Sequence, residues 1–139
     1  MARVRDLLHR FRPSGAPGAA NAAGVPADRT LEQTVVLERD PEAAREVARD
    51  FLRSYLGLTN YTTSMQRAGF TALDVADDGS DNLIDRLVVH GDARVLAAAV
   101  RAHLEAGADH VCVQVRSKTG DIVPALREIA AELRLPFSG

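Results

Sequence analysis

The sequence predicts an α/β fold built on a parallel sheet, of the kind that repeating strand–helix barrels use. The strongest observation is residues 91–115, GDARVLAAAVRAHLEAGADHVCVQV, which join an amphipathic helix, a glycine and an alternating strand in direct succession. A second strand is expected over residues 33–38, QTVVLE, followed at once by a long helix. Strands that alternate with helices across short connections are typical of parallel pairing.

The N-terminal segment precedes the expected fold. Residues 13–27 consist of Pro, Gly, Ala, Ser, Asn and Val, and they hold almost no side chain able to build a core. We therefore expect residues 1–30 to form a disordered segment and linker, and residues 31–139 to form the folded domain.

The first helix is expected to begin at Asp40 and Pro41, a capping residue followed by a proline at the first helical position. Apolar residues then recur at helical spacing until Gly57, while acids and arginines three residues apart cover the opposite face. Residues 58–70 are predicted to be a loop with one short helix capped by Thr62 or Thr63. Residues 77–80 are predicted to be a turn, and residues 81–90, DNLIDRLVVH, a helix.

The remaining elements are a helix over residues 92–106, a strand over 110–115 and a last helix over about 124–135, which gives two strands in all. Gly107 is expected to end its helix in the left-handed conformation that only a residue without Cβ adopts cheaply. The valines of the second strand are expected to face the helices, which leaves His110, Cys112 and Gln114 on the other face.

Composition excludes several classes of function. A formal charge of −2 and only 4% aromatic residues disfavour nucleic-acid binding. No apolar run approaches the ~20 residues of a membrane helix. The single cysteine, Cys112, lies among valines, which predicts a small buried side chain in a reduced, cytoplasmic compartment.

No metal site is expected. An acidic stretch partly matches a calcium-loop template, but Ala76 stands where the third position needs a ligand, so a capped surface turn explains the stretch better. The histidines form no HxH or HxxxH pair that would indicate zinc. The residues that match the calcium template are Asp74, Asp78, Gly79, Ser80, Asn82 and Asp85.

Several segments in order resemble the C-terminal part of the luciferase-like monooxygenase superfamily, closest to its coenzyme F-420-dependent oxidoreductases. The segments are YLGLTNYTTSMQRAGF, the GD helix start at residue 91 and AGADHVCVQV, within residues 31–135. The resemblance implies a partial (β/α)8 TIM barrel that holds only the last two strand–helix units. It also implies hydride transfer with coenzyme F-420 or FMN. The strands that bring the family's hydride-transfer residues are not among these segments, so the catalytic residues stay unassigned.

Ligands of such barrels gather at the C-terminal ends of the strands. Gln114, Arg116 and Ser117 are therefore the expected cofactor-binding residues, with Glu38 and Arg39 at the end of the other strand. The alternative for these positions is a buried amide bonded to backbone and a solvated loop.

Two functions follow from the sequence. The first is a truncated or split F-420- or FMN-dependent oxidoreductase. The second is a non-catalytic α/β remnant that associates with itself or with a complementary barrel fragment through exposed strand edges. The substrate is a small molecule of unknown identity.

Overall fold

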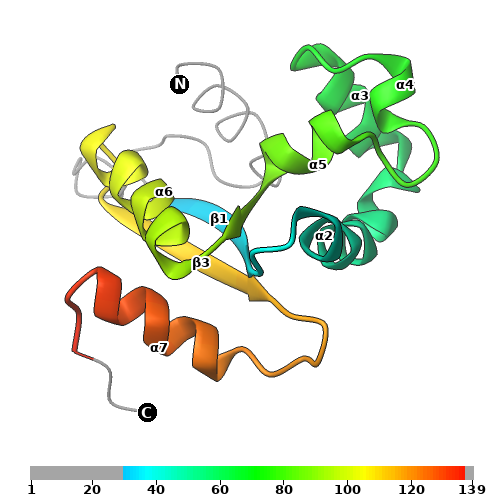
Figure 1. Cartoon of the computed structure of the whole chain (residues 1–139). Coiled ribbons are helices and arrows are strands. Elements are labelled where there is room, and N and C mark those ends of the chain that lie inside the picture. The colour runs from blue at the N-terminus through cyan, green and yellow to red at the C-terminus, as the bar shows by residue number, and fades with distance from the viewer. Residues whose placement is uncertain (1–29, 137–139) are drawn as a thin grey trace.

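A computed structural model describes residues 30–136 of the chain, in which one sheet lies between two groups of helices (Figure 1). The elements are β1 Thr30–Leu37, α2 Pro41–Leu56, α3 Thr59–Arg67, α4 Ala72–Val75, α5 Asp81–Leu87, β2 Val88–Gly91, α6 Ala93–Glu105, β3 His110–Arg116 and α7 Val123–Glu132. The predicted disordered segment lies outside the described residues, except for Thr30, which begins β1. Within residues 30–136, no helix is long and apolar enough to cross a membrane.

The three strands are parallel, in the order β2-β1-β3. Val36 of β1 is the Cα partner of His90 in β2 and of Arg116 in β3, so these three residues form one row across the sheet. The predicted α/β class and the parallel sheet are therefore confirmed.

The predicted count of two strands is wrong, because the helix expected over residues 81–90 stops at Leu87. Ser80 caps α5 by accepting from the backbone N–H of Leu83 at 3.1 Å, and Val88–Gly91 continues as a strand paired with β1. Val88 and Val89 are β-branched, which favours the extended backbone. Pairing with β1 also gives their backbone N–H and C=O groups hydrogen-bond partners. The helical spacing of neighbouring residues in the sequence does not reveal this pairing.

The strand order also differs from the order expected of barrel units. In a (β/α)8 barrel, consecutive strands are neighbours and every helix lies on the outer face. Here β1 lies between the other two strands, and the chain returns across it from β2 to β3. The connection from β2 to β3 runs across the sheet in the direction opposite to that from β1 to β2. Because both connections are right-handed, α6 lies on the face opposite to α2. The described strands therefore form an open sheet with helices on both faces, as Figure 1 shows.

Two separate hydrophobic clusters hold the layers together. Val35 and Val36 are adjacent in β1, so their side chains point to opposite faces, and they are 0% and 2% exposed. The face of Val36 packs against α2 and α5, and the face of Val35 packs against α6 and α7. The α2 side contains Val36, Ala44, Ala48, Leu52, Ile84 and Val88, and the α7 side contains Val35, Leu96, Val115, Ala125 and Ile129.

The end of α6 agrees with its sequence signal. Gly107 has a φ of 100°, and its N–H donates to the carbonyl of Leu104 at 3.0 Å. The N–H of Ala108 donates to the carbonyl of His103 at 3.1 Å, which completes a Schellman motif. The glycine therefore turns the chain directly from α6 toward β3.

The predicted cap of the short helix after Gly57 is wrong. The helix α3 begins at Thr59, with Leu58 in the capping position, and the Thr62 hydroxyl donates to the carbonyl of Thr59 at 3.1 Å inside the helix. A capping box forms instead at Thr71, whose side chain and Asp74 bond reciprocally to start α4.

Candidate functional site

The C-terminal ends of β1 and β3 lie side by side, and the chain leaves them toward opposite faces of the sheet. The loop after β1 leads into α2, whereas the loop after β3 leads into α7. Open α/β sheets bind ligands outside the carboxyl ends of their strands, at the point where the strand order reverses. We call residues 38–40 and 116–121 the switch-point edge.

Gln114 lies half-buried on the α2 face of β3. The orientation of its amide is assigned from the hydrogen bonds that it can form. The amide oxygen faces Arg116 and accepts from its Nη2 at 2.9 Å. In this orientation the amide nitrogen donates to Glu32 Oε1 at 3.0 Å and to Thr34 Oγ1 at 3.1 Å. Gln114 therefore ties β3 to β1 and holds one side of the Arg116 guanidinium.

Arg116 ends β3 beneath α2. Its guanidinium carbon lies 4.1 Å from the centroid of the Phe51 ring, within the range of a cation–π contact. Among the described residues, no acceptor reaches the buried Nε of Arg116. A buried donor without an acceptor is costly, so an acceptor that reached Nε would stabilise this guanidinium.

The loop after β3 is rich in hydroxyl groups. Ser117 Oγ lies 3.1 Å from Thr119 Oγ1, which in turn accepts from the backbone N–H of Asp121 at 3.3 Å. Lys118 Nζ lies 3.6 Å from Glu46 Oε2, an ion pair that links this loop to α2. The Ser117 hydroxyl therefore belongs to an exposed loop at the same edge as Arg116.

Glu38 and Arg39 occupy the other half of the switch-point edge. Glu38 Oε1 accepts from the backbone N–H of Asp40 at 3.0 Å, which orders the turn into α2, and Arg39 is exposed. The structure thus places all five sequence-predicted residues at or next to one edge of the sheet. Their role in cofactor binding stays a prediction.

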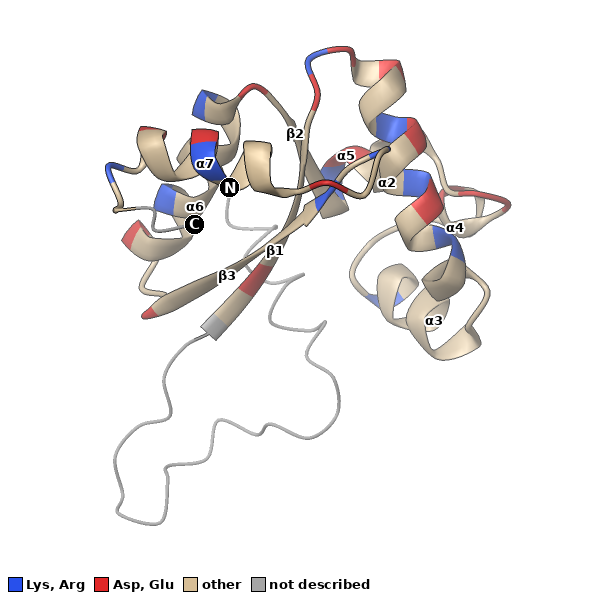
Figure 2. Cartoon of the chain, turned by 90° about the horizontal axis from the view of Figure 1, so that it is seen from below, with Lys and Arg blue, Asp and Glu red and all other residues tan. Residues whose placement is uncertain are grey.

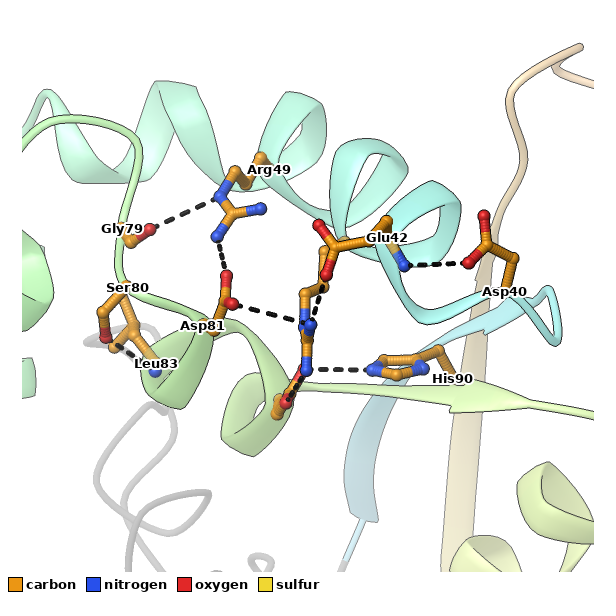
Figure 3. A network of polar contacts seen from close by, with 10 residues as sticks. Asp40, Glu42, Arg49, Gly79, Ser80, Asp81, Leu83 and His90 are labelled. Carbon is orange, nitrogen blue, oxygen red and sulfur yellow. Dashed lines mark hydrogen bonds and ion pairs between the residues drawn. The ribbon is translucent and has the colours of Figure 1, made fainter.

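A polar network that the sequence analysis did not identify joins α2, α5 and β2 (Figure 3). Asp85 receives two hydrogen bonds from Arg45, at 3.0 and 2.8 Å, and one from Nε2 of His90, at 3.0 Å. Hydrogen bonding to Arg45 is the main reason that the pKa of Asp85 falls to about 2, and the same contact raises the pKa of Arg45. Arg49 extends the network by bonding Asp81. The network anchors α2 to the β2 edge, and His90 lies in the same row as Arg116.

A buried polar pair lies on the opposite face of the sheet. Gln33 and His103 are 3% and 7% exposed, and His103 Nε2 donates to Gln33 Oε1 at 2.8 Å. Burial lowers the pKa of His103. Neither residue reaches the switch-point edge, so the pair is structural.

The acidic residues of the calcium-loop template do not converge. Asp74 closes the Thr71 cap and accepts from Ser80 at 2.5 Å, whereas Asp78 pairs with Arg53 and Asp85 with Arg45. Across residues 30–136, no three His, Cys, Asp or Glu side chains are grouped as metal ligands. The polar contacts of the stretch are those of a capped turn.

Cys112 is exposed, which corrects the prediction of a buried thiol. Its side chain points to the α2 face of β3, but α2 packs closer to the C-terminal half of the sheet, where its cluster includes Val36 and Val88. Glu32, the Cα partner of Cys112 in β1, is exposed as well. The N-terminal half of this face is therefore open among the described residues.

Comparison of the chain with protein-family models, with curated proteins and with solved structures gives no match.

Proposed function

We propose that this chain is the C-terminal portion of a luciferase-like oxidoreductase that transfers hydride with coenzyme F-420 or FMN. The support from sequence is the resemblance of several ordered segments within residues 31–135. The cofactor's ring supplies the hydride chemistry, and the protein contributes position and charge. The residues proposed to contact the cofactor are Gln114, Arg116 and Ser117.

The observation that carries the proposal is the adjacency of the two strand ends at the switch-point edge. Arg116 stands there beside Val36, with its guanidinium held by Phe51 and Gln114 and one buried N–H without an acceptor among the described residues. A cation held in place where open sheets bind ligands suits an anionic cofactor, and both F-420 and FMN carry phosphate. Hydrogen bonds to such a charged group are about twice as strong as neutral ones.

A complete barrel would require another arrangement of these strands. Barrel order places β3 beside β2, whereas β3 here occupies one edge of β1. The two arrangements exclude each other within one molecule. We therefore propose that the cofactor binds the open sheet as it stands, because moving β3 to the edge of β2 would separate Arg116 from Val36 and remove the proposed site.

The test is a titration of the purified chain with F-420 and, separately, with FMN, followed by the fluorescence of each cofactor. Because the switch-point edge of a three-stranded sheet supplies few contacts, we expect weak saturable binding. The expected dissociation constant is about 1 mM, which corresponds to a binding free energy of about 4 kcal/mol. Arg116→Gln is expected to weaken binding at least about tenfold, equal to about 1.4 kcal/mol.

The matched control is Arg134→Gln, which removes the same charge just after the last turn of α7, at the other end of that helix from the switch-point edge. It is expected to leave the affinity unchanged. Equal loss in both variants would indicate nonspecific attraction, and no binding of either cofactor would refute the proposed site.

A second function is favoured by one observation, the free edges of the sheet. Among the described strands, β2 and β3 each pair on one side only. Unpaired strand edges are templates for further pairing. We propose as the alternative that the chain is a non-catalytic association module, which predicts an oligomeric mass in light scattering without cofactor.

A further inference from the structure

We infer that a second copy of this chain pairs with β3 edge to edge, antiparallel and in a register centred on Val113. The inference rests on the association proposal and specifies its partner, its strand and its register. The product is a single sheet that runs through two molecules across a two-fold axis.

The two edges of the sheet are not equivalent. β2 has four residues and ends at Gly91, whereas β3 has seven residues, HVCVQVR, without proline or glycine. In Figure 2 the ribbon of β3 is tan along most of its length, the colour of residues other than Lys, Arg, Asp and Glu, whereas α2 alternates blue and red. Natural edge strands are usually protected by charges, proline or short length. β3 lacks these protections until Arg116, which favours it as the pairing edge.

The two-fold axis limits the possible registers. Side chains directly opposite each other in a sheet lie on the same face, so a symmetric pair must be centred on one residue of β3. Centring on Val113 pairs Val113 with its own copy and Val111 with the copy's Val115. Centring on Cys112 would instead place Val115 against Asp109. Only the Val113 register matches all three valines.

The helix on the valine face has a matching pattern. α7 covers the valine side of β3 and runs back along the sheet, so its two ends lie near opposite ends of the strand (Figure 1). Ile122 and Val123 at its start are 39% and 43% exposed, and Leu135 after its end is 57% exposed. The proposed two-fold axis brings the start of α7 in one copy toward the end of α7 in the other. The same axis therefore brings together the two ends of α7 at which apolar residues are exposed.

Cys112 provides a native reporter of this register. In the Val113-centred pair, Cys112 lies opposite Gln114 of the copy and diagonal to the copy's Cys112, at about 7–8 Å between Cα atoms. That distance exceeds disulfide geometry but suits a short bifunctional maleimide. The thiol is exposed and therefore accessible to the reagent.

The experiment combines oligomeric mass with site-specific cross-linking at mildly alkaline pH, which favours thiol–disulfide exchange. Cys112→Ser provides the background. Val113→Cys in that background places two thiols directly opposite each other, about 4.5–5.5 Å apart between Cα atoms, within disulfide reach. Val111→Cys is the matched control, because its copy lies four residues along the partner strand, about 13 Å away.

The expected result is a dimer of the unaltered chain and disulfide formation at least tenfold faster for Val113→Cys than for Val111→Cys. A maleimide cross-link through native Cys112 gives the same answer without any core substitution, and circular dichroism checks the fold of each variant. A monomer at all concentrations would overturn both this inference and the association proposal. A dimer that cross-links equally at both positions, or at neither, would overturn the register alone.

Discussion

The buried pair of Gln33 and His103 offers a direct test of how α6 is held on the sheet. Replacing His103 with Leu removes the donor that bonds Gln33 Oε1 at 2.8 Å, in a position where Gln33 is 3% exposed. Water has little access to that oxygen. The acceptor therefore loses its hydrogen bond and gains none in exchange.

The magnitude follows from the cost of an unsatisfied buried group. We expect His103→Leu to lower the free energy of unfolding by about 1–3 kcal/mol, and Gln33→Leu to do the same by stranding the imidazole N–H. The double variant replaces both partners with apolar side chains and is expected to lie within about 1 kcal/mol of the unaltered chain. The expected coupling energy between the two positions is therefore about 1–3 kcal/mol.

The assay is urea unfolding followed by circular dichroism, since the chain has no Trp to report by fluorescence. With a slope of about 1–3 kcal/mol/M, a loss of 2 kcal/mol moves the midpoint by about 1 M. Strictly additive losses in the double variant would show that the two side chains do not interact, and the assignment of a buried hydrogen bond would then be wrong.

Three further predictions concern titration and backbone strain. Burial lowers the pKa of His103 below 6.5, so the free energy of unfolding is expected to fall as the pH drops from about 7 to about 5. The midpoint of urea unfolding should depend less on pH over this range in His103→Leu. The pKa of Asp85 lies at about 2 instead of 3.8, so its contribution to stability is present above pH 3.8 and is lost as the pH falls toward 2. Asp85→Asn also breaks the Arg45 contact, and its circular dichroism signal should change less with acid over this pH range. Gly91 has a φ of 142°, and an added Cβ would lie 3.1 Å from Val95 Cβ, so Gly91→Ala should cost more than about 1 kcal/mol in urea unfolding, with part of the loss recovered in the double variant with Val95→Ala.

The elements that the sequence predicted correctly carry their signals within a few residues. Asp40 and Pro41 begin α2, and Gly107 ends α6 with a positive φ. The strand after Gly107 was also expected, because its valines alternate over residues 110–115. In each case the backbone preference and the hydrophobic pattern indicate the same structure.

The strand β2 was missed because its local pattern is ambiguous. Leu83, Ile84, Leu87 and Val88 keep helical spacing, and four residues are too few to show a period of two. The pairing with β1 decides the conformation of Val88–Gly91, and this contact is not visible in a window of neighbouring residues.

The sequence predicted where the candidate site residues lie, but not the contacts that hold their side chains. The rule that ligands gather at carboxyl strand ends selected Gln114, Arg116 and Ser117. The stacking of Arg116 on Phe51 and the bond of Asp85 to Arg45 join residues that lie far apart along the chain. Such contacts depend on the strand order, and the sequence analysis, which expected barrel units, did not predict the order β2-β1-β3.

Amide chemical shifts give the most direct test of the proposal that F-420 or FMN binds at the switch-point edge. In a ¹⁵N-labelled sample titrated with F-420 or FMN, we expect concentration-dependent shifts of the amides of Glu38, Arg39, Arg116, Ser117 and Lys118. Amides at the start of β1 and of β3 should stay unchanged. Shifts that cluster elsewhere, or no shifts at millimolar cofactor, would show that neither cofactor binds at this edge.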